Sequence, residues 1–287
     1  MSANHAFFQS QVSQIETAYG RAEAEELIYR LIDAYLGKTR LEYWDITGAV
    51  IDLDAPEIKR FFEQAIKRLL QFEPVQYIVG HTYFLDYKLE VSPAVLIPRQ
   101  ETEELVSMII DNEKDNKQLR ILDIGTGSGC IPIALSLELD CQEIIGLDIS
   151  EAALAVAQNN SVLNSAKVDF HQLDILNENI PYQKLDIIVS NPPYVLESDK
   201  KQMDKNVLNY EPGLALFVPD DAPLKFYEAI AEKSLNALVK GGRLYFEIHE
   251  KFGQEVKLLL QNLGFREIIL CQDLFMDKDR MIFTKRK

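Results

Sequence analysis

The sequence is poor in cysteine and contains no long hydrophobic run. Its three cysteines, Cys130, Cys141 and Cys271, lack the close spacing of a zinc or thioredoxin-type motif. We therefore expect no disulfide framework and no metal site, and we interpret these cysteines as buried small apolar residues in a reducing compartment. No apolar run approaches the roughly 20 residues of a membrane span, and Met1–Ser10 lacks the features of a signal peptide. A cytoplasmic protein with no membrane partner is expected.

Positive charge is also scarce. The 287 residues include 30 lysines and arginines against 45 aspartates and glutamates, a formal net charge of −15. Binding to nucleic acid through its phosphates needs a basic face, so this charge disfavours that class of protein, although it does not exclude a local basic patch. It suits a partner that is itself basic. The length allows one large domain or two ordinary ones.

The beginning of the chain predicts a helical domain for substrate recognition, over residues 1–75, without catalytic residues. Apolar residues recur with helical period over Ala22–Leu36, and Gly37 is expected to end that helix. A second helix is predicted to start from a cap at Asp54 and to run to Phe72. This region is therefore expected to pack or to recognise a partner.

Residues 76–98 are predicted to form a β-hairpin that links the helical domain to a catalytic domain over residues 99–287. Aromatic and β-branched residues recur there near period two. A helix is expected next, started by Thr102 or an acidic neighbour. Arg99 with Glu101 or Glu103 has two possible interpretations: a functional group, or only a charge cluster at that helix start.

Strands and helices alternate in the remaining chain. This alternation predicts an α/β fold with a mostly parallel, doubly wound sheet and an antiparallel finish. The polar stretch Leu196–Gly213 is irregular and is a candidate lid. The predicted strands cover residues 120–124, 143–147, 168–173, 185–190, 243–248, 267–271 and 280–284.

A glycine-rich turn follows the first of these strands. Gly125-Thr126-Gly127-Ser128-Gly129 leads into a helix predicted over Cys130–Leu139. Glycines let the backbone approach a ligand closely, and a helix start offers unpaired N–H groups. The spacing differs from the Gly-x-Gly-x-x-Gly of a dinucleotide site. With Asp123 before it, the loop favours a ligand with a carboxylate and an ammonium over a pyrophosphate; the alternative is a plain strand-to-helix turn.

Two further acids end the next two strands. Asp148 follows the second strand, where an acid can accept both ribose hydroxyls of an adenosine. Asp174 follows the third strand and can accept the adenine amino group, while Ile175 can pack on the ring. Helix capping is the alternative role for Asp148, and capping or a loop position is the alternative for Asp174.

The most distinctive residues are Asn191-Pro192-Pro193-Tyr194, directly after the strand predicted at Leu185–Ser190. The prolines stop that strand and hold Asn191 at its carboxyl end, where open α/β sheets bind ligands. The Asn191 side-chain oxygen and the Pro192 carbonyl can each accept one N–H of a substrate NH₂ group. Tyr194 can stack on the substrate plane. Such an arrangement orients the nitrogen lone pair toward a methyl donor, and orientation supplies much of the rate.

A glycine loop, a ribose acid and an adenine acid in this order fit S-adenosylmethionine (SAM) in a Rossmann-like class I methyltransferase with a seven-stranded sheet. Asn191, Pro192 and Tyr194 are the candidate catalytic residues, and Leu96, Arg99 and Pro193 join them as candidate substrate contacts. The candidate cofactor contacts are Gly125, Thr126, Gly127, Ser128, Gly129, Asp148, Asp174, Ile175 and Asn191.

From about residue 75 onward the chain resembles the HemK-type (PrmC-like) glutamine methyltransferases of peptide chain release factors. It departs from them at His249, where glycine is usual, and at Phe217–Asp220, where a glycine-rich turn is common. The residues that carry the resemblance are Gln76-Tyr77-Ile78, Leu96-Ile97-Pro98-Arg99, Glu101-Thr102-Glu103, Gly125–Ile131, Asn191–Tyr194, Glu211-Pro212, Gly241-Gly242 and Glu247-Ile248.

The resemblance implies methylation of the glutamine side-chain amide in the Gly-Gly-Gln motif of class 1 release factors, with SAM as donor. It implies that the helical domain and the hairpin hold the release factor, and we expect a monomer without direct contact to nucleic acid. Because Asn-Pro-Pro-Tyr alone is shared with nucleic-acid amino methyltransferases, methylation of adenine or guanine is the alternative. A donor-binding factor without activity is a third, disfavoured by the complete set of site residues.

Overall fold

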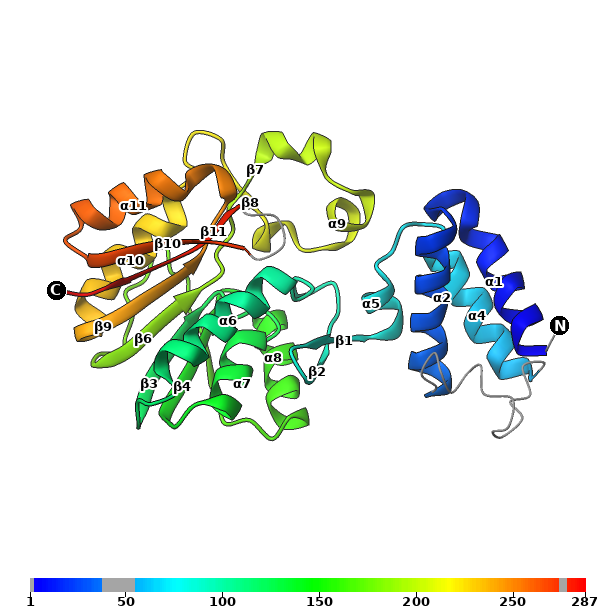
Figure 1. Cartoon of the computed structure of the whole chain (residues 1–287), viewed down its shortest axis with the longest axis horizontal. Coiled ribbons are helices and arrows are strands. Elements are labelled where there is room, and N and C mark those ends of the chain that lie inside the picture. Colours follow the sequence, from blue (N-terminus) through cyan, green and yellow to red (C-terminus); the bar gives the residue numbers. More distant parts are fainter. Residues whose placement is uncertain (1–2, 38–54, 274–277) are drawn as a thin grey trace. The chain divides into compact units, whose positions relative to one another are not determined.

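The computed structural model describes residues 3–37, 55–273 and 278–287. The chain forms two compact units (Figure 1). One contains the residues up to Gly80 together with Asp204–Tyr210, and the other contains His81–Met203 and Glu211–Lys287. Among the described residues, no helix has both the length and the apolarity to cross a membrane.

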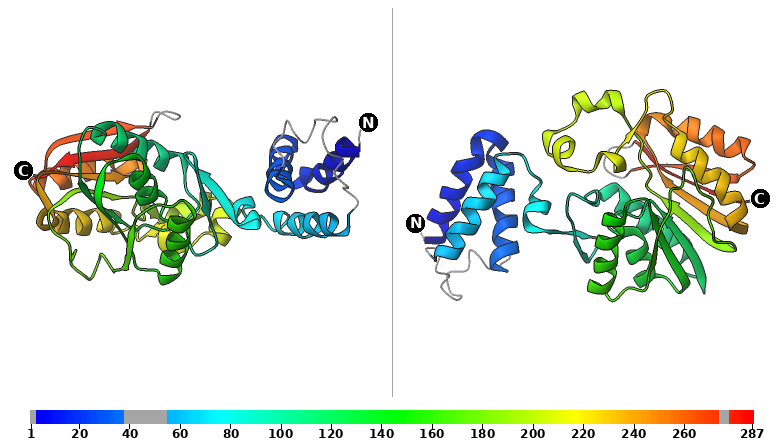
Figure 2. Two further views of the ribbon diagram at one scale, coloured as in Figure 1. Left: turned by 90° about the horizontal axis from the view of Figure 1, so that it is seen from below. Right: turned by 180° about the vertical axis from the view of Figure 1, so that it is seen from behind.

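The first unit is helical, as predicted. Gly37 ends α2 in the left-handed conformation, and its N–H donates to the Asp33 carbonyl. Helix α4 ends earlier than expected, because Phe72 adopts a φ of 63°, and the expected cap Asp54 lies outside the described residues. Figure 2 shows these helices from two further sides. Their bounds are α1 Ala3–Tyr19, α2 Arg21–Leu36, α4 Pro56–Leu69 and α5 Val75–Val79.

A short piece of chain from the second half of the sequence completes this unit. The Tyr210 hydroxyl, at the end of α9 (Lys205–Tyr210), donates to the Gln71 carbonyl at 3.0 Å. At the other end of α9, the Lys205 ammonium lies 4.9 Å from the centre of the Phe72 ring. The expectation of irregular structure over Leu196–Gly213 is therefore wrong here, because helices this short show no hydrophobic period.

The linking hairpin is present but shorter than expected. Strand β1 (His81–Phe84) pairs antiparallel with β2 (Tyr87–Glu90), and the turn places Leu85 at a φ of 50°. The Leu85 N–H donates to Glu103 at 2.8 Å, which holds the turn against α6 (Gln100–Glu113). The residues before the hairpin form α5 instead of strand.

The second unit is built on a sheet of seven strands among the described residues, in the order β10-β11-β9-β6-β3-β4-β5. Neighbours from β9 to β5 are parallel, and β10 and β11 pair antiparallel at one edge, as predicted. Its other elements are β3 Leu119–Ile124, α7 Cys130–Glu138, β4 Cys141–Asp148, α8 Glu151–Leu163, β5 Asp169–Gln172, β6 Leu185–Ser190, β7 Val195–Leu196, η1 Glu197–Gln202, η2 Gly213–Ala215, β8 Phe217–Val218, α10 Lys225–Ala237, β9 Leu238–Glu247, η3 Glu250–Phe252, α11 Gly253–Asn262, β10 Arg266–Gln272 and β11 Asp279–Lys285.

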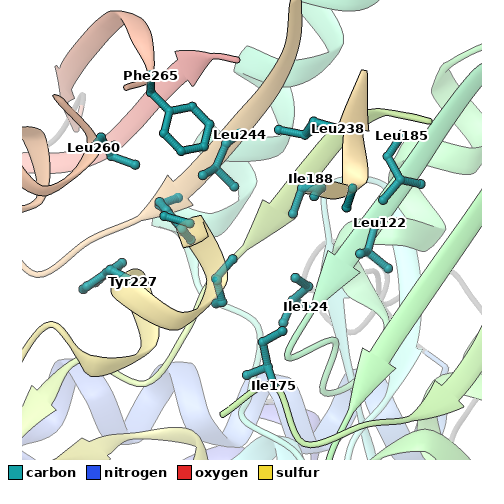
Figure 3. Close-up of a cluster of buried hydrophobic side chains, with 14 of the residues drawn as sticks. Leu122, Ile124, Ile175, Leu185, Ile188, Tyr227, Leu238, Leu244, Leu260 and Phe265 are labelled. Carbon is teal, nitrogen blue, oxygen red and sulfur yellow. The ribbon is translucent and has the colours of Figure 1, made fainter. Parts of the chain in front are cut away.

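Helices cover both faces of this sheet (Figure 1). Helices α6 and α7 pack on one face, and α10 and α11 pack on the other. Figure 3 shows the buried cluster to which Tyr227 and Leu260, from the second pair of helices, belong together with strand residues such as Leu122 and Leu244. These cores position the strand ends, because the central strands β3 and β6 bury side chains on both faces.

The three cysteines are half-buried and free, where full burial was expected. Burial raises the pKa of the Cys130 thiol to about 12 and that of Cys141 to about 11. These thiols are therefore protonated and unreactive at neutral pH.

Candidate active site

A cavity of about 270 Å³ lies at the carboxyl ends of β3, β4 and β6, within the second unit. Open α/β sheets bind ligands at this edge, and the strand ends here carry most of the residues expected from sequence. The predicted residues that line the cavity are Leu96, Arg99, Gly125, Thr126, Gly127, Ser128, Asp148, Asp174, Ile175, Asn191, Pro192 and Pro193. Gly129 and Tyr194 are not among its lining residues.

The glycine loop turns tightly between β3 and α7. Gly125, Gly127 and Gly129 have φ values of 76°, 54° and 80°, a backbone region that other residues rarely adopt. A Cβ on Gly129 would lie 3.1 Å from the Cβ of Ala157, so this glycine also allows α8 to approach. Gly125, Thr126, Gly127 and Ser128 of this loop form part of the cavity wall.

Asp148 fixes the shape of this loop. One carboxylate oxygen accepts the Gly127 N–H at 2.8 Å, and the other accepts the Ser150 N–H at 2.9 Å. The cap of α8 is Ser150, whose hydroxyl accepts the Ala153 N–H. Burial raises the pKa of Asp148, while the backbone N–H groups of Ser150 and Gly127 oppose that rise. Asp148 therefore reaches the cavity as an oriented carboxylate with lone pairs left to accept further donors.

Asp123 is a second acid near the loop, completely buried at 0% exposure. Among the described residues, neither of its oxygens has a hydrogen bond of normal geometry, although the Thr126 hydroxyl is near enough to lower its pKa. Burial outweighs that effect and raises the pKa of Asp123 to about 7. Burial of this kind favours the neutral, protonated form of the acid over the charged form.

Asp174 and Ile175 follow β5, the strand beyond β4, and both line the cavity. The Asp174 carboxylate accepts from the Leu176 N–H at 2.9 Å and from the Asn177 amide at 2.7 Å, and the Asn177 bond is the largest cause that lowers its pKa. Ile175 is nearly buried and presents an apolar surface to the cavity. An acid and an apolar side chain are thus held side by side, as a purine ring with an amino group would require.

Asn191 follows β6 and faces the same cavity. Its side-chain nitrogen donates to the Thr102 hydroxyl at 3.0 Å, and that hydroxyl donates to Glu247 at 2.6 Å. Thr102 and Glu247 are buried, at 3% and 1% exposure. The expectation that Thr102 starts a helix is wrong: α6 begins at Gln100, and Thr102 points from its first turn into the site.

Tyr194 belongs to the same network. Its hydroxyl donates to the second oxygen of Glu247 at 2.8 Å, and its ring meets the His249 ring edge-on at 5.9 Å. Burial raises the pKa of the Tyr194 hydroxyl, and burial also raises that of Glu247 against the two hydroxyl donors. The predicted stacking of Tyr194 on a substrate stays a prediction.

Arg99 also has a different partner from the expected one. Its guanidinium binds Glu211 at 2.6 Å, and the second oxygen of Glu211 accepts the Ile97 N–H at 3.1 Å. This carboxylate ties the loop before α6 to the start of η2, and both segments line the cavity. The interpretation of Arg99, Glu101 and Glu103 as one charge cluster is therefore wrong.

Sequence reasoning gave no role in the site to Glu247 or Glu211. Both stand in the motifs that carry the family resemblance, but neither shows its partner in the local sequence. A usable signal existed for Glu247: it ends β9, which pairs with β6, so its side chain had to lie near Asn191. An acid at the end of a buried parallel strand is unusual enough to mark a site.

Two family models match the sequence: the PrmC N-terminal domain over residues 9–80 and the methyltransferase small domain over residues 100–209. The release factor glutamine methyltransferase of Bacteroides thetaiotaomicron is 45% identical over 229 residues, covering 79% of this chain and 81% of that protein. The enzyme of the same name from Flavobacterium psychrophilum is 40% identical over 274 residues, covering 94% of this chain and 95% of that protein.

Solved structures show the fold. A methyltransferase from Pyrococcus furiosus has a TM-score of 0.51 at 16% identity, covering 70% of this chain and 90% of that chain. A 16S rRNA methyltransferase from T. thermophilus, in complex with AdoMet and guanosine, has a TM-score of 0.52 at 17% identity, covering 72% and 50%. The predicted class I methyltransferase fold is confirmed.

The cavity fits SAM, the cofactor of this fold. Ribose hydroxyls suit the oriented carboxylate of Asp148, which lines the cavity, and the glycines of the loop let the backbone approach a ligand closely. Two family models, relatives that cover 79% and 94% of the chain, and the fold agree: the chain is a SAM-dependent enzyme and belongs to the release factor glutamine methyltransferase family.

Proposed function

We propose that this protein transfers a methyl group from SAM to the side-chain amide nitrogen of the glutamine in the Gly-Gly-Gln motif of class 1 translation release factors. The relatives named above support the acceptor. The observation that carries the proposal is that Asn191 lines the same cavity as the glycine loop while Thr102 accepts from its amide nitrogen. That bond leaves the amide oxygen of Asn191 for an N–H of the acceptor.

The donor would be held along the glycine loop. Asp148 would accept the ribose hydroxyls, Asp174 the adenine amino group, and Ile175 would pack on the adenine ring; Asn191 would close the site next to the reacting methyl. When bound, SAM supplies a methyl group on a positively charged sulfur. The residues proposed for the loop contacts are Gly125, Thr126, Gly127, Ser128 and Gly129.

The acceptor half has to overcome the weak nucleophilicity of an amide nitrogen, whose lone pair is delocalised. The Asn191 side-chain oxygen and the Pro192 carbonyl would each accept one N–H of the glutamine NH₂ group. This fixes the nitrogen with its lone pair toward the methyl group and disfavours delocalisation as the new bond forms. As the C–N bond forms, the C–S bond of SAM would break and S-adenosylhomocysteine would leave, while the nitrogen would release one proton to solvent. No strong base is required for this step, so orientation would provide the main contribution to rate.

The remaining predicted residues have supporting roles in this proposal. Pro193 keeps the turn stiff, and Tyr194 offers its ring beside the glutamine. Leu96 and Arg99 would border the bound release-factor loop, supported by their position in the cavity wall. The Arg99–Glu211 pair would hold that wall in place.

The helical part and the hairpin would recognise the release factor, which the match to the PrmC N-terminal domain supports. We propose a monomer that binds its protein substrate without direct contact to nucleic acid, in the cytoplasm where release factors act. The net charge of −15 suits a basic partner surface. The same charge and the named relatives disfavour adenine or guanine in nucleic acid as the acceptor.

Mass spectrometry of release factors from cells with and without this protein tests the proposal, together with methyl transfer to purified release factor. Methylation should occur at the Gly-Gly-Gln glutamine. Asn191→Ala should lower kcat by about 10² to 10³, as loss of one oriented hydrogen-bonding group does, and Asn116→Ala, on an exposed loop, should not. Labelled methyl in RNA or DNA and none in the release factor would refute it.

A further inference from the structure

The amide of Asn191 can present either of two chemically opposite ends to an acceptor. Its oxygen accepts hydrogen bonds and its nitrogen donates them, and the two ends have nearly the same shape. A substrate NH₂ group needs acceptors, so a turned amide would place N–H against N–H. Something in the protein must therefore select the end that faces the cavity.

A buried chain of hydrogen bonds makes this selection. Glu247 stands at the end of β9 and accepts the Thr102 hydroxyl at 2.6 Å, a short bond of the charge-assisted kind. A threonine hydroxyl has only one hydrogen, and it is used in that bond. The oxygen of Thr102 can then only accept, so Asn191 must offer its nitrogen, which lies 3.0 Å away.

The other oxygen of Glu247 also accepts a hydrogen bond. The Tyr194 hydroxyl donates to it at 2.8 Å, so both carboxylate oxygens accept from O–H groups. A carboxylate that only accepts cannot donate back to Thr102, and this fixes the direction of the whole chain. Among the described residues, no group donates to the side-chain oxygen of Asn191, which is left for the cavity.

We propose that Glu247 and Thr102 are positioning residues that set the orientation of the Asn191 amide, Glu247 acting through the Thr102 hydroxyl. The catalytic consequence rests on the proposed function, since it concerns an NH₂ acceptor. The orientation itself depends only on residues of this chain. Burial of both positioning residues keeps water from replacing the missing partner.

The matched pair Thr102→Val and Thr102→Ser tests the proposal. Valine keeps the shape and removes the hydroxyl, whereas serine keeps the hydroxyl. For methyl transfer to release factor, Thr102→Val should lower kcat by about 10- to 100-fold, the range for loss of a hydrogen bond in a charged network. Its Kd for SAM should stay within about threefold, and Thr102→Ser should recover most of kcat. Equal kcat losses in both variants, or none in valine, would overturn the proposal.

A second measurement needs neither SAM nor a release factor. Water exchange of the Asn191 side-chain NH₂ group, followed by NMR and assigned with Asn191→Asp, should be slow in the wild type and clearly faster in Thr102→Val. Glu247→Gln should also speed this exchange, although among the described residues the side chain of Glu247 is bonded to Thr102 and Tyr194 and not to Asn191 itself. Unchanged exchange in both variants would refute the proposal. If exchange responds while wild-type protein transfers nothing to release factor, the proposed function fails and the positioning role stands.

Discussion

The two halves of the cavity are assembled over very different distances along the chain. In the donor half, the bond from Gly127 to Asp148 spans 21 residues. In the acceptor half, the bonds Asn191–Thr102, Arg99–Glu211 and Thr102–Glu247 span 89, 112 and 145 residues. The donor half is a local motif, whereas the acceptor half exists only after distant elements have packed. Substitutions in the donor half should therefore affect cofactor binding, whereas substitutions in the acceptor half should affect turnover or stability.

The largest effect is expected at Asp148. Asp148→Ala removes a charged acceptor proposed for two ribose hydroxyls and also releases the Gly127 N–H. Each bond to a charged group contributes about 1.5 kcal/mol or more, so SAM affinity should fall about 100-fold or more by calorimetry. Thr102→Val in the acceptor half is the control and should leave that affinity nearly unchanged. Similar losses in both variants would remove the distinction between the halves.

Glu211 should matter for stability. Glu211→Ala leaves the Ile97 N–H and the guanidinium of Arg99 without their partner, and should lower the free energy of unfolding by about 3 kcal/mol. The loss stays at the lower end of the usual range because the Arg99 side chain is 34% exposed. Glu211→Gln keeps an acceptor and should lose about 1 kcal/mol. Urea unfolding measures both, and equal losses would contradict the assigned contacts.

The pH dependence of stability should depend on Asp123. Because burial raises its folded pKa to about 7 from 3.8, the protonated form is favoured in the folded protein. The stability that protonated Asp123 gives the folded protein is fully present below 3.8, the pKa of this group in the unfolded chain, and is lost as pH rises through 7. The neutral variant Asp123→Asn should therefore gain stability over wild type by about 2 kcal/mol between pH 5.5 and pH 8. The control Asp111→Asn, at an exposed ion pair, should show no such trend; a flat difference at residue 123 would contradict the prediction.

The smallest effect is expected at His249, where this chain departs from the usual glycine. His249→Gly removes the edge-on ring contact with Tyr194 and should cost about 1 kcal/mol in unfolding. Burial lowers the pKa of His249, so its 3.6 Å contact with Asp199 adds little at neutral pH. Turnover should change less than threefold in steady-state assays. A larger fall would make His249 part of the acceptor half.

The donor half could be predicted from sequence because its determinants are local. Strand, glycine turn and helix start follow one another within the stretch from Arg120 to Ser150, and the chain order alone brings Asp148 beside the loop. Even there, the unpaired state of Asp123 needed the structure. Burial of a carboxylate depends on what packs around it, which periodicity does not report.

The acceptor half could be predicted only in part. Asn191 and the two prolines after it could be identified from the sequence, because a proline ends a strand and restricts the backbone of adjacent residues. The hydrogen-bond partners in this half could not be identified, because a bond between residues far apart in the chain produces no recognisable sequence pattern. Thus the sequence suggested that Thr102 starts a helix and that Arg99 belongs to a charge cluster with Glu101 or Glu103.

One feature of the fold limits how the two units can be recombined. Because Asp204–Tyr210 belongs to the helical unit, the chain passes between the units three times, after Gly80, before Asp204 and after Tyr210. A fragment that ends at Gly80 would lack the Tyr210 bond to Gln71 and the Lys205 contact with Phe72. A chimaera with a relative therefore needs Met1–Gly80 and Asp204–Tyr210 from the same parent. We expect these two segments to have evolved together.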